Sequence, residues 1–161
     1  MTEIQHVKEI DLDSFNVRLR SDGIVHVHLK ANTLVTVEMQ KDMQDAYWEI
    51  TSVKRPFIFT GDEFVSITYK ARKNSKKMEP FVPNIGTAMV VRNLAQRIIA
   101  DYYYKFDRPG IPYIVVTDFE KGIQWITETF DIPTVEEENL RSSASDSKQT
   151  AAWADTMRIK K

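Results

Sequence analysis

The feature that most constrains the fold is an alternation of short apolar runs with helical patterns. Apolar runs at 57–60, 88–91 and 111–116 each precede a stretch in which apolar residues recur every three or four positions. Runs of this length are typical of buried strands, and strands that alternate with helices are joined by right-handed crossovers. The pattern therefore predicts a largely parallel sheet with helices packed on it.

An antiparallel hairpin is predicted before this alternation. Residues 15–20 and 24–30 alternate apolar and polar side chains, and the turn-forming segment 21–23 separates them. In the second of these strands the alternation defines a core face and an opposite face. The core face carries Val25, Val27 and Leu29, and the opposite face carries Ile24, His26 and His28.

Helix boundaries complete the predicted order. Thr36 is expected to cap a helix that follows the hairpin, and segment 117–120 resembles a capping box that begins the last helix. A further helix is expected within 62–83, where Pro80 and Pro83 end it. The order is then ββαβαβαβα, which predicts an α/β fold with the hairpin as an antiparallel edge of a mostly parallel sheet.

The chain is expected to form one domain with a tail. Residues 1–14 are interpreted as an N-terminal segment, 15–132 as the α/β domain, and 133–161 as a polar, disordered tail, because its Glu- and Ser-rich composition cannot offset the entropy of ordering. Trp153 and Met157 lie at helical spacing near the end of the tail. They predict a short terminal helix that either docks on a partner or covers the domain's own surface.

Composition narrows the class of protein. The chain has 161 residues, 42% of them hydrophobic, which is enough for one core. Its 22 basic and 23 acidic residues give a net charge of −1, so no overall field attracts nucleic acid or an anionic membrane. There is no cysteine, which excludes disulfides and thiolate chemistry. No run of about 18 apolar residues occurs, and the expectation is a cytoplasmic protein without membrane insertion.

Two groups of polar residues are candidate sites of chemistry. His26 and His28 lie two apart on a strand and could supply two metal ligands, but a third is missing, so the interpretation is a pair of solvent-facing histidines and no metal. Asp62 and Glu63 follow a strand at the carboxyl edge of the sheet, where α/β proteins place functional loops. They are also ordinary helix-start residues, which is the favoured interpretation, because no partner for acid–base chemistry is coupled to them. Neither an enzyme nor a cofactor is therefore predicted.

The basic run and the tyrosines are candidate contact surfaces, depending on whether they are exposed. The basic run between Lys70 and Lys77 is expected to be a solvated helix face, since no aromatic residue interrupts it. Tyr102 and Phe106 are expected in the core. Tyr103 and Tyr104 are then partly exposed and are candidate contacts for a ligand or a partner.

The order of elements resembles the STAS domain family, which includes bacterial anti-sigma-factor antagonists and the cytoplasmic domains of sulfate transporters. Segments 22–27, 91–97 and 104–109 are similar to a set of small, uncharacterised bacterial STAS-like proteins. The resemblance covers roughly residues 15–130. It implies a non-catalytic regulatory module that acts by binding a protein partner. A small-ligand or lipid-binding module is the alternative.

The resemblance also points to one loop. In the antagonists of that family, a loop after a central strand presents a serine at a helix start, and phosphorylation of the serine blocks partner binding. The corresponding loop here is 61–68, in which Ser66 is the candidate for phosphorylation although the glycine that follows the family's serine is absent. The resemblance thus implies a partner-binding loop that contains Gly61, Asp62, Glu63, Ser66 and Thr68.

Overall fold

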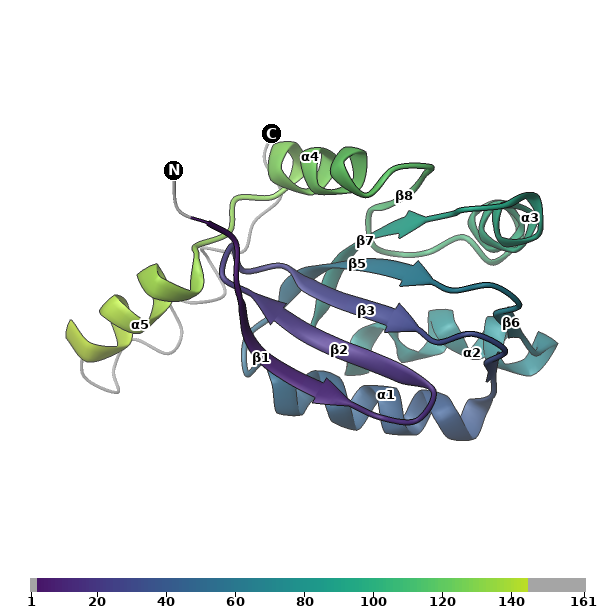
Figure 1. Ribbon diagram of the computed structural model, residues 1–161, viewed down its shortest axis with the longest axis horizontal. Helices are drawn as coiled ribbons and strands as arrows, with labels where there is room; N and C mark the ends of the chain where they lie inside the picture. The colour runs from purple at the N-terminus through teal and green to yellow at the C-terminus, as the bar shows by residue number, and fades with distance from the viewer. Residues whose placement is uncertain (1–2, 145–161) are drawn as a thin grey trace.

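The computed structural model describes residues 3–144, and its centre is a six-stranded mixed sheet (Figure 1). The strands of the sheet are β1 (His6–Asp11), β2 (Phe15–Arg20), β3 (Val25–Leu29), β5 (Arg55–Gly61), β7 (Asn84–Val90) and β8 (Tyr113–Val116), in the order β1-β2-β3-β5-β7-β8. Strands β3, β5, β7 and β8 pair in parallel, and β1 and β2 extend the sheet as antiparallel strands. The predicted α/β fold with an antiparallel edge is confirmed.

The helices lie on both faces of this sheet. They are α1 (Val37–Ile50), α2 (Tyr69–Met78), α3 (Leu94–Tyr102), α4 (Phe119–Thr129) and α5 (Val135–Ala144), with a 3-10 turn η1 (Glu79–Phe81) after α2 and a π-helical turn η2 (Tyr103–Asp107) after α3. The predicted cap of α1 is confirmed, because Thr36 Oγ1 accepts from the backbone N–H of Met39. Helix α4 begins within the predicted segment 117–120, but its cap is Asp118, whose Oδ1 accepts from the backbone N–H of Glu120, and no capping box with Thr117 forms among the residues that the structure describes.

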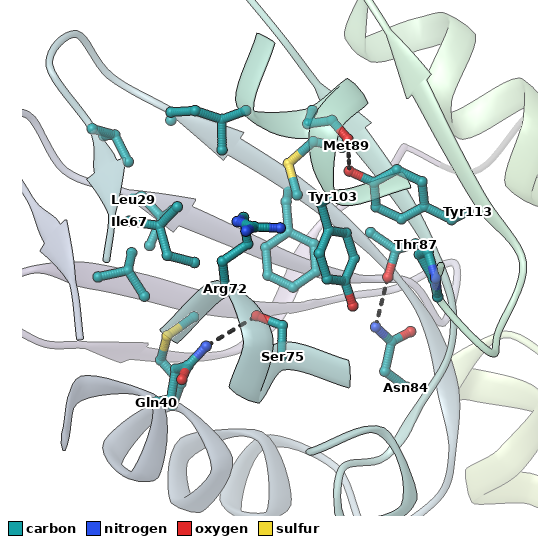
Figure 2. Close-up of a pocket in the computed structure, with 18 of the residues that line it drawn as sticks. Leu29, Gln40, Ile67, Arg72, Ser75, Asn84, Thr87, Met89, Tyr103 and Tyr113 are labelled. Atoms are coloured by element: carbon teal, nitrogen blue, oxygen red, sulfur yellow. Dashed lines mark hydrogen bonds between the residues drawn. The ribbon is translucent and has the colours of Figure 1, made fainter. Parts of the chain in front are cut away.

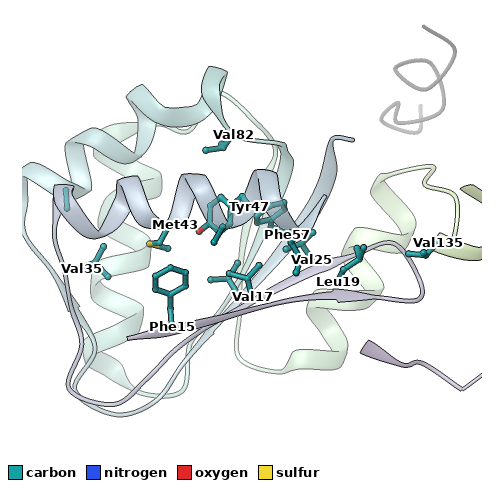
Figure 3. Packing of buried hydrophobic residues seen from close by; sticks show 14 residues of the cluster. Phe15, Val17, Leu19, Val25, Val35, Met43, Tyr47, Phe57, Val82 and Val135 are labelled. Carbon is teal, nitrogen blue, oxygen red and sulfur yellow. The ribbon is translucent and has the colours of Figure 1, made fainter. Parts of the chain in front are cut away.

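Strand alternation divides the core between the two faces. On one face Val25, Val27 and Phe57 pack beneath α1 (Figure 3), and on the other Ile24 and Ile58 pack beneath α4. The hairpin register places Val17 opposite Val27, as the predicted alternation requires. Helices α1, α2 and α3 thus share the first face, and α4 covers the second.

A second sheet of two short parallel strands lies beyond the carboxyl ends of β3 and β5. It consists of β4 (Leu34–Val35) and β6 (Ser66–Ile67). Two-residue strands carry no periodicity that a sequence can reveal, because their pairing is made only by backbone groups. This small sheet ties the loop after β3 to the loop after β5.

Residues 6–11 and 135–144 are more ordered than the sequence predicts. Strand β1 pairs with β2, although only Ile10 of its side chains packs against the core. Helix α5 replaces the first part of the predicted disordered tail, because Val135 is buried and the Glu138 carboxylate forms an ion pair with Arg55, which is 2% exposed. The predicted terminal helix lies outside the described residues.

The predicted burial of Tyr102 and Phe106 is wrong. These side chains are 44% and 55% exposed, and Leu94 and Ile98 on the same stripe are exposed as well. Helix α3 faces the sheet through the side that carries Ala100, whose carbonyl accepts from the Tyr113 hydroxyl at 3.4 Å. The apolar stripe is wider than the surface that the sheet offers to the helix.

Candidate functional site

A cavity of about 240 Å³ lies between the sheet and helices α1, α2 and α3 (Figure 2). Phe59 of β5 and Met89 of β7 line it from the sheet, and Met43, Met78 and Ile99 line it from the three helices. Phe59 and Met89 belong to central strands, yet both are only partly buried. The central strands are therefore not covered by packed helices at this place.

The π-helical turn η2 shapes one wall of the cavity. An extra residue in the turn changes the direction of side chains after α3, and π-turns of this kind are frequent at functional sites. Tyr103 lines the cavity, and Asp107 at the end of the turn reaches α2. Arg108 then ends the turn in the left-handed conformation, with φ 52°.

Arg72 is the charged side chain of α2 in this cavity. It is 8% exposed, and its Nη1 donates to Asp107 Oδ2. Lys73 Nζ lies 2.8 Å from Asp107 Oδ1, and this carboxylate raises the pKa of Lys73. The Arg72 guanidinium also lies over the rings of Tyr102 at 4.3 Å and Tyr69 at 5.3 Å.

The predicted basic helix face is therefore wrong at Arg72. That residue is buried and faces the cavity, although Lys76 and Lys77 of the same run are exposed as expected. The basic run between Lys70 and Lys77 spans about two helical turns, so its cations point to different sides of α2. The sequence alone does not show which of them faces the protein interior. Asp107, which offsets the buried charge, is 35 residues away in sequence.

Most other polar groups of the cavity are already paired within the protein. Gln40 Nε2 donates to Ser75 Oγ at 3.0 Å, and Asn84 Nδ2 donates to Thr87 Oγ1 at 2.8 Å. The Tyr103 hydroxyl has no hydrogen-bond partner among residues 3–144. Burial raises the pKa of Tyr103, so its phenol stays protonated and can donate.

The predicted partner-binding loop forms another wall of the cavity. Gly61, Val65, Ser66 and Ile67 all line it. The loop is held by backbone hydrogen bonds to the loop after β3, from Ser66 N to Thr33 O at 2.9 Å and from Thr68 N to Val35 O at 3.0 Å. An occupant of the cavity would therefore contact this loop directly.

The structure distributes the predicted residues of this loop over different roles. Ser66 is exposed and lies in β6, and Thr68 caps α2 by accepting from the backbone N–H of Ala71 at 3.0 Å. Glu63 is exposed, and its carbonyl accepts from Asn32 N at 3.1 Å. Ser66 thus lies three residues before the first residue of α2 and two before its cap, and its phosphorylation stays a prediction.

Asp62 belongs to a polar cluster on the opposite face of the sheet. His28 Nε2 lies 3.1 Å from Asp62 Oδ2, and Arg92 Nη1 lies 3.7 Å from Asp62 Oδ1. His28 Nδ1 and His26 Nε2 each lie 2.7 Å from Thr60 Oγ1. The two histidines therefore share one hydroxyl, although the sequence predicted that they face solvent without partners.

The donor and acceptor roles in this cluster can be assigned by starting from the Asp62 carboxylate, which can only accept. If the Nε2–H of a neutral His28 donates to Asp62, the Nδ1 atom of His28 must accept from the Thr60 hydroxyl. Thr60 Oγ1 then accepts from the Nε2–H of His26. Desolvation, with the nearby His28 as the second cause, lowers the pKa of His26 to about 4, which keeps this imidazole neutral.

The two tyrosines predicted as contacts are separated by the fold. Tyr103 lines the cavity, whereas Tyr104 lies outside it, is 58% exposed and stacks on Tyr113 with a centroid distance of 5.8 Å. Arg72 and Thr60 were not predicted as site residues. Each contacts partners more than 30 residues away, a distance at which neither spacing nor periodicity carries a signal.

Within residues 3–144, no helix is both long and apolar enough to cross a membrane. In the same part of the chain, no group of three or more His, Cys, Asp or Glu side chains is arranged to hold a metal ion.

Comparison with known proteins gives a family and a similar solved structure. A family model described as a domain of unknown function, DUF7793, matches residues 17–129. A crystal structure of an uncharacterised DUF3478 protein with a SpoIIAA-like fold, from Shewanella loihica PV-4, is 11% identical, with a TM-score of 0.42. The match covers 78% of this chain and 98% of that chain. No curated protein matches the chain. The regulatory role that the STAS resemblance implies stays a prediction.

Proposed function

This chain belongs to the DUF7793 family, a domain of unknown function, and we propose that it is a binding module for a small, mainly apolar ligand. The observation that carries this proposal is the cavity over the central strands, lined by Phe59, Met89 and the apolar faces of three helices. Apolar cavities with a few polar groups are the usual form of small-molecule sites. The position fits too, since α/β folds bind ligands near the carboxyl ends of their parallel strands.

The size of the cavity sets the size of the ligand. An engineered apolar cavity of about 150 Å³ binds benzene. A cavity of about 240 Å³ is correspondingly suited to a compact or short-chain molecule. Benzene has six non-hydrogen atoms, so scaling by the two volumes gives a ligand with about ten non-hydrogen atoms inside the protein.

A direct test is calorimetric titration with 1-octanol of the wild type and of Met89→Trp. The larger indole is expected to fill the cavity from the sheet and to abolish heat of binding. Met39→Trp is the matched control, because Met39 packs against the α1 core but does not line the cavity. Wild-type protein that gives no binding heat, or equal binding by Met89→Trp, would contradict the proposal.

A partner-binding role for loop 61–68 is the second candidate. Phe64 is 75% exposed and has φ 62°, a conformation that is unfavourable for a bulky side chain. Leu34, which belongs to β4 of the small sheet, and Tyr69, the first residue of α2, are also exposed. Strained residues with exposed apolar side chains gather at sites of contact. Because the loop also lines the cavity, a bound ligand and a bound partner would contact the same segment, and one could change the affinity for the other.

Phe64→Gly tests the second candidate. Glycine accepts a positive φ without strain, so the variant is expected to be at least as stable as the wild type while losing the aromatic contact. Wild type, Phe64→Gly and the exposed-site control Leu140→Ala would be immobilised and exposed to the same host lysate. A protein retained by wild type and control and lost with Phe64→Gly supports the role. Equal retention by all three would contradict it.

A further inference from the structure

Arg72 offers hydrogen-bond donors to the cavity that the protein itself does not use. Its Nη1 binds Asp107, but its Nε and Nη2 atoms have no hydrogen bond with any residue of 3–144. The side chain is 10% exposed and lines the cavity, where Figure 2 shows its guanidinium among the lining side chains. A guanidinium presents its donors as a planar fork that matches a carboxylate.

The local charge also favours an anion. Arg72 and Lys73 both pair with the single carboxylate of Asp107, so this carboxylate is not dedicated to the charge of Arg72. The Lys73 side chain is 42% exposed and solvent screens its charge, whereas Arg72 is buried, so an anion at the two unused donors of Arg72 would add a counter-charge where screening is weakest. The Arg72 guanidinium lies over the rings of Tyr69 and Tyr102, and these contacts limit the orientations of the fork.

The acidic group of the cavity does not compete for this position. Glu79 lies seven residues after Arg72, about two helical turns away. Its Oε1 accepts from Gly110 N at 2.9 Å, and its Oε2 accepts from Ile111 N at 3.2 Å. The Glu79 carboxylate is thus held by the backbone of residues 110 and 111, near the C-terminal end of α2, whereas Arg72 lies in the N-terminal half of this helix.

We infer that the ligand of this cavity is a short-chain or compact monocarboxylate, whose carboxylate binds the Nε and Nη2 atoms of Arg72 and whose apolar part lies over Phe59 and Met89. This inference rests on the proposed ligand-binding function and adds the chemical class of the ligand. The hydroxyl of Tyr103 is a separate hydrogen-bond donor in the same cavity.

The test compares three eight-carbon ligands with different head groups, titrated into the full chain at pH 7.5 by calorimetry. Octanoate is ionised at this pH, 1-octanol is neutral, and octylammonium is a cation. Octanoate is expected to bind at least tenfold more tightly than 1-octanol, and octylammonium more weakly than either. In Arg72→Gln, the affinity for octanoate is expected to fall at least tenfold and that for 1-octanol to change less than twofold. Lys77→Gln, an exposed lysine of the same helix, is the control that keeps both affinities.

The outcomes separate the two proposals. Equal affinity for octanoate and 1-octanol, or the tightest binding by octylammonium, overturns the assignment of the carboxylate to Arg72 and leaves the binding cavity in place. No binding of any of the three overturns the cavity function itself. If Arg72→Gln does not fold because Asp107 loses its buried partner and keeps only Lys73, the double variant Arg72→Gln, Asp107→Asn removes both charges of the buried pair. Whether or not these variants fold, the ratio of the wild-type affinities for octanoate and 1-octanol tests the assignment of the carboxylate to Arg72.

Discussion

At the scale of single residues, the hydroxyl of Thr60 joins two histidines of the neighbouring strand. The register of β3 and β5 places His28 directly opposite Thr60, and His26 lies two positions earlier on the same face. His26 also contacts the Phe119 ring, with a centroid distance of 5.2 Å. Its imidazole is thus held between a hydroxyl and an apolar surface, which favours the neutral form.

This environment predicts a pH-dependent stability. The pKa of His26 is lowered from 6.5 to about 4, so the unfolded chain takes up a proton that the folded chain refuses between these values. His26 therefore makes its full contribution to the free energy of unfolding above pH 6.5, and this contribution falls by about 3 kcal/mol as the pH drops toward 4. Urea unfolding at several pH values is expected to show a flatter profile for His26→Gln than for wild type. The control His6→Gln, exposed on β1, keeps the wild-type slope. Identical slopes in wild type and His26→Gln would contradict the assignment.

A second residue-scale prediction concerns the pair Arg55 and Glu138. Removing the carboxylate in Glu138→Ala leaves a guanidinium that is 2% exposed without its counter-charge. The expected loss is about 3–5 kcal/mol of unfolding free energy, measured by urea denaturation. The control is Glu136→Ala, because Glu136 lies two residues before Glu138 on the exposed side of α5. This variant is expected to lose less than about 1 kcal/mol of unfolding free energy. A similar loss in both variants would mean that the buried pair does not anchor α5.

At the scale of elements, the sequence predicts best where one side of an element is buried. The hairpin, α1 and α4 follow their alternation or their helical stripe. The cap of α1 lies at Thr36 as predicted, and the cap of α4 lies at Asp118 within the predicted segment 117–120. Strand β1 and helix α5 were missed, because polar side chains and a single long-range ion pair hold them in place. Sequence patterns report the burial of apolar faces and do not report partners of this kind.

Helix α2 carries the main polar group of the cavity, and its first turn depends on Thr68. Thr68→Ala removes the oxygen that accepts from the Ala71 N–H and is expected to lower the unfolding free energy by about 1 kcal/mol. Thr68→Ser keeps a hydroxyl and is expected to restore most of this loss. Amide hydrogen exchange would locate the effect in the first turn of α2. Equal stability of the alanine and serine variants would show that the cap is not needed.

At the scale of the whole molecule, the cavity is a product of layer packing. Helices α1, α2 and α3 share one face of a sheet that they do not cover completely, which leaves Phe59 and Met89 partly open. The sequence predicted the sheet and its helices, and it predicted Tyr103 as a contact. It could not predict the gap, since the volume between helices depends on how they cross and not on the pattern along any one of them.

The methionines allow the most direct test of ligand binding in this cavity. Met43, Met78 and Met89 line it from α1, α2 and β7, whereas Met39 packs against the same core outside it. The measurement is the methyl NMR spectrum of ¹³C-methionine-labelled protein during titration with octanoate. The account predicts saturable shifts of Met43, Met78 and Met89 with one dissociation constant, while Met39 stays in place. Unchanged signals from the three cavity methionines, or shifts of all four in proportion to added octanoate, would contradict it.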